Sequence, residues 1–139
     1  MATFVDTSGI LALLDSSEIR HGAAWQAWGH LIDSDEELHT SSFVLVESYA
    51  LIQARLGLEA VRTLHEELLP LLTIHWVDDG LFAESAAALL VADRRRLSLV
   101  DCVSFVVMRR LGVRSAFALD SHFNEQGFET SIQPDLRQP

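Results

Sequence analysis

Apolar residues along the chain fall into two kinds of segment. Short apolar runs bounded by polar residues predict five strands, over residues 3–5, 38–40, 73–77, 115–119 and 128–132. Longer stretches repeat apolar residues at helical spacing and predict six helices, over residues 7–14, 18–32, 43–56, 58–71, 81–93 and 101–111. Strand and helix therefore alternate, with short loops between them.

This alternation predicts an α/β domain of three layers, in which a mainly parallel sheet of about five strands is flanked by helices. At 139 residues, 49% of them hydrophobic, the chain is long enough to bury one core. We expect a single domain over residues 1–133 and a loosely held tail over residues 134–139, which contain two of the three prolines. Sheets of this kind bind ligands beyond the carboxyl ends of their strands.

Two aspartates directly follow predicted strands. Asp6 comes after the first strand and Asp120 after the fourth, each with a serine or threonine next to it. Both carboxylates are expected at the carboxyl edge of the sheet, where ligands bind. The alternative for each is a structural role, as the N-cap of the helix that follows.

Two further acids fall in apolar helices. Glu47 interrupts the apolar pattern of residues 43–52, and a carboxylate on a buried helix face needs a partner. Asp101 begins the apolar stretch 101–108, although a helix dipole alone also favours an acid at a helix start. Glu47 is therefore the hardest of the four acids to explain by structure alone.

The charge balance limits the kinds of ligand. The chain has 20 acidic and ten basic residues, a formal net charge of -10, and all the basic residues are arginines. This balance argues against nucleic-acid binding by general attraction, and the absence of lysine excludes P-loop phosphate binding and Schiff-base chemistry. Local phosphate contacts remain open to arginine. The candidates for an RNA-facing patch are Arg94, Arg95 and Arg96, followed by Arg109, Arg110 and Arg114; a solvated helix end is the alternative for each of them.

With no lysine available, the cheapest partner for a cluster of acids is a cation from solvent. Hard carboxylate oxygens indicate Mg²⁺ or Mn²⁺. Zinc is disfavoured, because Cys102 is the only cysteine and the six histidines show no tight ligand spacing. His122, two residues after Asp120, is placed to touch a phosphate or orient an acid, but its position alone does not put it among the catalytic residues.

The single cysteine indicates a reducing compartment, and the cytoplasm is the expected location. The N-terminal stretch has no basic segment before its apolar run, and Asp6 and Asp15 bracket that run too closely for a signal peptide or membrane span.

The order of these four acids along the sequence resembles that of a PIN domain. The matching motifs are Asp6-Thr7-Ser8 after the first strand, Glu47 in a mid-chain helix, Asp101-Cys102-Val103-Ser104 opening another helix, and Asp120-Ser121-His122-Phe123 after a late strand. The resemblance extends from Val5 to Phe128, and the chain's size is similar to that of VapC-type toxins of bacterial toxin–antitoxin pairs.

The resemblance implies a ribonuclease that depends on Mg²⁺ or Mn²⁺, in which a bound cation activates water to cleave an RNA phosphodiester. It implies that Asp6, Glu47, Asp101 and Asp120 are the catalytic, metal-holding residues and that Ser8 and Ser104 support them by hydrogen bonds. It also implies an antitoxin protein as partner and a homodimer. No association with a membrane is expected, since the sequence shows no membrane span.

Three alternatives are weighed against this interpretation. A receiver-like phosphoacceptor domain needs a lysine and a pair of acids at the first strand, and the chain has neither. A catalytically silent PIN module that binds RNA or protein is disfavoured by the presence of all four acids. A PIN nuclease in RNA processing, without a toxin role, stays open. Trp25 and Trp28 could anchor a dimer or partner groove, but core packing is the preferred role for both.

Overall fold

The computed structural model describes residues 1–133. Its centre is a five-stranded sheet of order β3-β2-β1-β4-β5, and all neighbouring strands are parallel. The strands are β1 (Ala2–Val5), β2 (Glu37–Ser41), β3 (Thr73–His75), β4 (Ser115–Phe117) and β5 (Glu129–Thr130). The predicted α/β class with a mainly parallel sheet is confirmed. The tail predicted for residues 134–139 lies outside the described residues.

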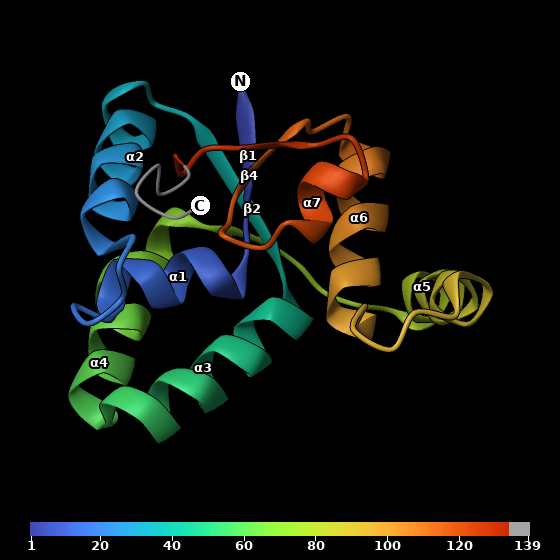
Figure 1. Ribbon diagram of the computed structural model, residues 1–139, viewed down its shortest axis with the longest axis horizontal. Coiled ribbons are helices and arrows are strands. Elements are labelled where there is room, and N and C mark those ends of the chain that lie inside the picture. The colour runs from blue at the N-terminus through green and yellow to red at the C-terminus, as the bar shows by residue number, and fades with distance from the viewer. Residues whose placement is uncertain (134–139) are drawn as a thin grey trace.

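The helices form the two outer layers. They are α1 (Thr7–Leu14), α2 (His21–Asp33), α3 (Ser42–Leu56), α4 (Leu58–Thr63), α5 (Asp79–Ala92), α6 (Leu99–Leu111) and α7 (His122–Glu125). Figure 1 shows α1 and α2 on one side of the sheet and α6 and α7 on the other, with α5 outside α6. α1 and α3 both begin at the carboxyl edge, and α3 contacts α1 and α6. This edge therefore lies between helices of both layers.

Two predicted helices differ from the observed ones, and one observed helix was not predicted. The helix expected over residues 58–71 is regular only to Thr63, then continues as a π-helical turn (Leu64–Leu68) and a 3₁₀ turn (Leu69–Leu71). Pro70 accounts for this end, because proline lacks the N–H that a regular helix needs. The helix expected from residue 18 begins at His21, after a turn in which Asp15 accepts hydrogen bonds from Ser17. α7 was missed because four residues are too few for a periodic pattern.

The core lies on both faces of the central strands. Phe4 and Val5 of β1 and Phe117 of β4 have no exposed surface, and α6 buries every residue from 101 to 108. Trp28 packs on Phe117 with ring centroids 5.2 Å apart, as expected for a core residue. The same expectation is wrong for Trp25, which is 55% exposed because it faces outward from α2.

Gly9 allows α1 to approach the sheet unusually closely. A Cβ atom on this residue would lie 2.2 Å from the carbonyl oxygen of Phe117, a distance that real contacts do not reach. Next to this contact, the backbone N–H of Asp6 donates to the same carbonyl at 3.1 Å. The glycine thus brings the start of α1, and Asp6 with it, against the end of β4.

Within residues 1–133, no helix is both long enough and apolar enough to span a membrane.

Candidate active site at the carboxyl edge of the sheet

All four acids singled out in the sequence line one open pocket of about 410 Å³ at the carboxyl edge. Asp6 comes from the β1–α1 turn, Glu47 from α3, Asp101 from α6 and Asp120 from the segment between β4 and α7. Glu18, which the sequence analysis did not single out, adds a further carboxylate to the lining. Five separate parts of the chain therefore contribute acids to one cavity.

Asp6 is the most buried of these acids, with 4% of its surface exposed. Its Oδ2 caps α1 by accepting hydrogen bonds from the backbone N–H of Ser8 at 3.1 Å and from the Ser8 hydroxyl at 2.6 Å. The Ser8 hydroxyl also accepts from the backbone N–H of Leu119 at 2.9 Å, which ties the start of α1 to the segment before Asp120. The structure thus places Ser8 where it supports an acid.

Burial raises the pKa of Asp6 from its ordinary 3.8 to about 7. The negative charges of Asp101 and Asp120 raise it further, whereas the hydrogen bonds from Ser8 lower it. A buried carboxylate beside two others is costly to ionise unless a cation joins them.

Asp101 lies in the first turn of α6 and is 8% exposed. It forms a capping box with Ser98: the Asp101 N–H donates to the Ser98 hydroxyl at 3.0 Å, and its carboxylate accepts from the Ser98 N–H at 3.2 Å. Burial, and then the charge of Asp120, raise the pKa of Asp101. Ser104, expected to support an acid, instead donates to the carbonyl of Val100 at 3.0 Å, because a serine inside a helix readily bonds one turn back.

Asp120 lies three residues beyond the end of β4 and is joined to His122. Asp120 Oδ1 accepts from the His122 backbone N–H at 2.9 Å and lies 3.1 Å from the ring Nδ1. The same Nδ1 lies 3.4 Å from Asp101 Oδ2. Although it is buried between two carboxylates, this nitrogen makes no well-formed hydrogen bond to any residue of the described chain.

Glu47 is positioned by hydroxyl contacts between α1 and α3. Next to it, the Ser48 hydroxyl donates to the Thr7 hydroxyl at 3.1 Å, and the Thr7 hydroxyl lies 3.4 Å from the carbonyl of Val44. The expectation that Glu47 is buried is wrong: it is half-buried and lines the pocket. The apolar residues around Glu47 suggested a buried helix face, but one of them, Val46, is 70% exposed.

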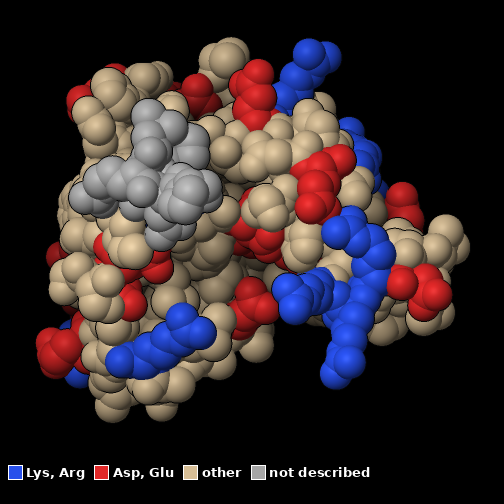
Figure 2. All heavy atoms as spheres, viewed as in Figure 1, with Lys and Arg blue, Asp and Glu red and all other residues tan. Residues whose placement is uncertain are grey.

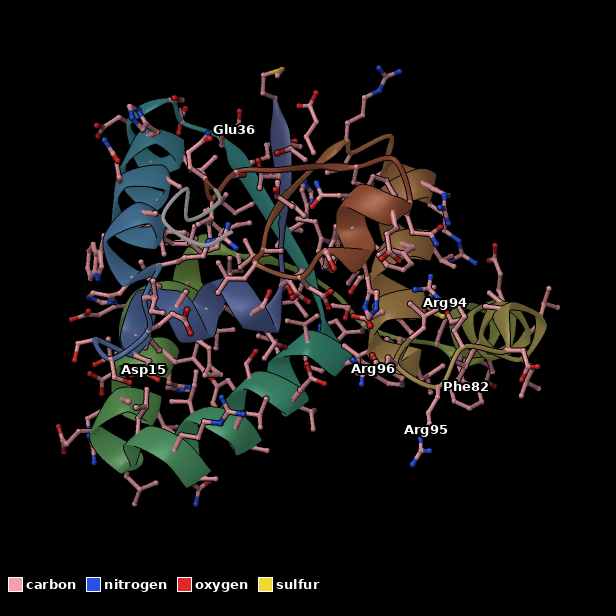
Figure 3. All side chains as sticks on the ribbon, in the orientation of Figure 1. Asp15, Glu36, Phe82, Arg94, Arg95 and Arg96 are labelled. Atoms are coloured by element: carbon pink, nitrogen blue, oxygen red, sulfur yellow. The ribbon has the colours of Figure 1, made fainter. Side chains whose placement is uncertain are left out.

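The three consecutive arginines have different surroundings (Figure 3). Arg94 donates to Glu125 of α7 at 2.9 Å. Arg95 points away from the body of the protein, and Arg96 lines the acidic pocket. The proposed patch is therefore not a single surface, and only one of its members lines the pocket.

A divalent cation fits this donor set. Asp101, Asp120 and His122 each offer a ligand atom, and these atoms lie within 4.8 Å of one another. Within residues 1–133, no arginine forms an ion pair with Asp6, Asp101 or Asp120, and His122 is the basic side chain that lies within 4 Å of two of them. Carboxylate oxygens favour Mg²⁺ or Mn²⁺. His122 comes close to Asp101 only when the chain folds, so the spacing of the histidines along the sequence did not reveal it as a possible ligand.

Residues 3–129 match the family model of the PIN domain. The chain belongs to the PIN-domain family. It is also 33% identical over 133 residues to the 23S rRNA-specific endonuclease VapC20 of Mycobacterium tuberculosis, in sequences from two strains, an alignment that covers 95% of this chain and 98% of the relative. The crystal structure of M. tuberculosis VapC20, described as a Sarcin-Ricin loop cleaving toxin, superposes with a TM-score of 0.81 at 32% identity, covering 96% of this chain and all of that one. The predicted resemblance is confirmed.

Glu18, Arg55 and Ser98 also line the pocket and were not proposed from the sequence. The Ser98-x-x-Asp101 spacing is a recognisable capping pattern, and it could have identified Ser98 as the residue that orients this acid. Arg55 follows Glu47 by eight residues on one helix, which places both on one face. No pattern in the sequence indicates Glu18, because its place in the pocket depends on the turn between α1 and α2.

Proposed function

We propose that this PIN-domain protein is a metal-dependent endoribonuclease and the toxin of a toxin–antitoxin pair. The observation that carries the proposal is the pocket in which Asp6, Glu47, Asp101 and Asp120 meet at the carboxyl edge, two of them with raised pKa values. The similarity to VapC20 over nearly the whole chain supports the same activity. Its setting would be the cytoplasm, as the sequence analysis expects.

In this proposal the four acids hold the cation, Mg²⁺ or Mn²⁺, with His122 beside Asp101 and Asp120. When bound, the cation activates water and offsets negative charge on the phosphodiester. The protein's own contribution is orientation: Ser8 and the Ser98 capping box hold two carboxylates in fixed positions before RNA arrives. Glu47, half-buried on α3, would add its carboxylate to the residues that hold the cation.

The RNA class follows from the relatives. VapC20 is described as specific for 23S rRNA and as cleaving the Sarcin-Ricin loop. We propose ribosomal RNA as the substrate of this chain too, with Arg94, Arg95 and Arg96 as candidate contacts. Arg96 is the strongest of the three, because it lines the pocket, whereas Arg94 is paired with Glu125.

The test is cleavage of a ribosomal RNA fragment with Mg²⁺ or Mn²⁺, with wild type compared with Asp101→Asn. The variant should keep its fold, measured by circular dichroism, and lose metal-dependent cleavage. Asp79→Asn is a matched control, because this exposed aspartate lies in the first turn of α5, outside the pocket. Full activity of Asp101→Asn would refute the proposed site.

Calorimetric titration with Mn²⁺ separates the alternatives. Wild type should bind the metal and Glu47→Gln should bind it more weakly. No binding and no cleavage by wild type would favour the silent PIN module. Cleavage without any small antitoxin-like reading frame beside the gene would favour a PIN nuclease in RNA processing.

We also propose an antitoxin partner and a homodimer. The acidic pocket suits an arginine presented by an antitoxin segment. For the homodimer, Val46 and Trp76, 70% and 72% exposed, line an apolar groove of about 530 Å³ with Tyr49. Sedimentation of Trp76→Glu should give a monomer, whereas Trp25→Glu, on α2 away from the groove, should leave the assembly unchanged.

A further inference from the structure

The arginines divide into two groups by their contacts. Within residues 1–133, five of them make a side-chain hydrogen bond or ion pair: Arg20, Arg62, Arg94, Arg109 and Arg110. The four without such a partner in this part of the chain are Arg55, Arg95, Arg96 and Arg114. Two of these four, Arg55 and Arg96, line the acidic pocket. Unpaired guanidinium groups beside a cluster of carboxylates are available to bind an anion.

Arg55 reaches the pocket from the last turn of α3. Glu47, Leu51 and Arg55 are spaced by four residues, and all three line the pocket, so one face of α3 forms this wall. The helical rise places Arg55 about 12 Å along the axis from Glu47. The pKa of Asp15 is lowered mainly by hydrogen bonds from Ser17 and, to a smaller extent, by the charge of Arg55. Asp15 and Arg55 nevertheless form no ion pair with each other.

Arg96 reaches the pocket from the segment between α5 and α6. That segment is fixed at both sides: Asp93 ends α5 in a left-handed conformation with φ of 50°, and Leu97 is 5% exposed. Ser98 then caps α6 and bonds Asp101. Arg96 is therefore held two residues from the cap that orients an acid, on a different wall from Arg55.

We propose that Arg55 and Arg96 bind RNA phosphates on opposite sides of the scissile one, so that the RNA strand crosses the pocket from α3 to the α5–α6 segment. This inference rests on the proposed nuclease function. Figure 2 shows acidic atoms in a hollow of this face with basic atoms on both sides of it. A chain of net charge -10 repels RNA elsewhere, so two local arginines set where the strand is held.

The distance between Glu47 and Arg55 along α3 indicates how much RNA the pocket wall contacts. A wall of about 12 Å between Glu47 and Arg55 corresponds to a few nucleotides of backbone, so Arg55 contacts a phosphate beyond the one being cleaved. An RNA that ends before this phosphate loses the Arg55 contact and keeps the Arg96 contact. Duplex RNA cannot bring its backbone into an open pocket of this size as readily as an unpaired segment can, so the substrate is an unpaired strand or loop.

The experiment measures binding of fluorescent single-stranded RNA by anisotropy, in an Asp101→Asn background that leaves the RNA intact. Arg55→Gln and Arg96→Gln should each weaken binding about fivefold and reduce the slope of log affinity against log salt by about 0.7. Arg114→Gln is the matched control, because this exposed arginine is also unpaired but precedes β4, at the opposite edge of the sheet. Its binding should be unchanged.

Oligonucleotides shortened from either end test the crossing direction. The effect of Arg55→Gln should vanish when the RNA is shortened from one end, and the effect of Arg96→Gln when it is shortened from the other. The inference is overturned if shortening the RNA from the same end removes the effects of both substitutions. It is also overturned if both variants bind RNA as Arg114→Gln does. Cleavage by the wild type is measured separately, and its absence would refute the proposed nuclease function. Normal cleavage by the wild type, together with unchanged RNA binding by the arginine variants, would refute only this inference.

Discussion

Asp6 makes the metal-free protein less stable at neutral pH than at acid pH, and Asp6→Asn should remove this dependence. In the folded protein burial raises its pKa to about 7, whereas the unfolded chain has the ordinary 3.8. Below pH 3.8 both states hold the proton, and the contribution of Asp6 to stability is fully present. As pH rises toward 7, the unfolded state releases the proton first, so the free energy of unfolding falls.

The size of the effect follows from the two pKa values. Each pH unit between them changes the free energy of unfolding by about 1.4 kcal/mol. The whole interval corresponds to a loss on the order of 4 kcal/mol by pH 8. Asparagine carries no charge to bury, and it is as good an N-cap as aspartate, so the α1 cap survives the substitution.

The assay is urea unfolding of both proteins in chelator from pH 4 to pH 8. Asp6→Asn should match wild type at pH 4 and exceed it by roughly 2 to 4 kcal/mol at pH 8. Asp15→Asn is the control of opposite sign, because hydrogen bonds from Ser17 lower the pKa of this half-buried acid, so its replacement should give no gain at pH 8. Adding Mn²⁺ should then stabilise wild type and leave Asp6→Asn nearly unaffected.

A difference between Asp6→Asn and wild type that stays constant across this pH range would refute the reasoning. Burial would then not be the main influence on this carboxyl group. A gain at pH 8 that persists in Mn²⁺ would separate the two parts of the argument: the acid would be costly to ionise, but no cation would offset its charge.

Three shorter predictions concern the supports of the site. Gly9→Ala should destabilise the fold by about 3 kcal/mol, because its new methyl group meets the backbone of β4, whereas Gly29→Ala, which has open space in α2, should stabilise it by up to about 1 kcal/mol; thermal unfolding measures both. Ser98→Ala should cost about 1 kcal/mol in the same assay and lower cleavage, because Asp101 loses its capping partner. His122→Ala should weaken Mn²⁺ binding about tenfold by calorimetry, and unchanged affinity would restrict this residue to orienting its neighbours.

Strands β1 and β4 were the most predictable, because burial on both faces makes them nearly continuous apolar runs. All five strands appear within a few residues of their expected positions, and the acid after β1 lies at the carboxyl edge as expected. The helix over residues 58–71 was less predictable, because its apolar spacing continues past the point where Pro70 prevents regular hydrogen bonding. Periodicity reports which face of a segment is apolar, but it does not report where the backbone can continue.

The candidate site was predictable where an acid follows a strand, opens a helix or, as Glu47 does, interrupts an apolar helix pattern. Asp6 and Asp120 were found by their positions after strands. Arg55 was not, because its place in the pocket depends on α3 packing beside α1, a contact between elements that no local pattern encodes. His122 was considered and set aside for a similar reason: its ring meets Asp101 only when α6 and α7 lie together on one face of the sheet.

Capping and metal binding are alternative roles for the aspartates in the sequence, but the geometry makes them compatible. Asp6 caps α1 through Oδ2, and Asp101 bonds the start of α6 through Oδ2. Within residues 1–133, Oδ1 of both acids accepts no hydrogen bond, so each carboxylate is fixed by one oxygen and keeps the other available. A capped aspartate cannot turn toward solvent when its charge becomes costly. The cap therefore maintains the repulsion in the pocket that a bound cation would relieve, and this is why loss of Ser98 should weaken the proposed cleavage.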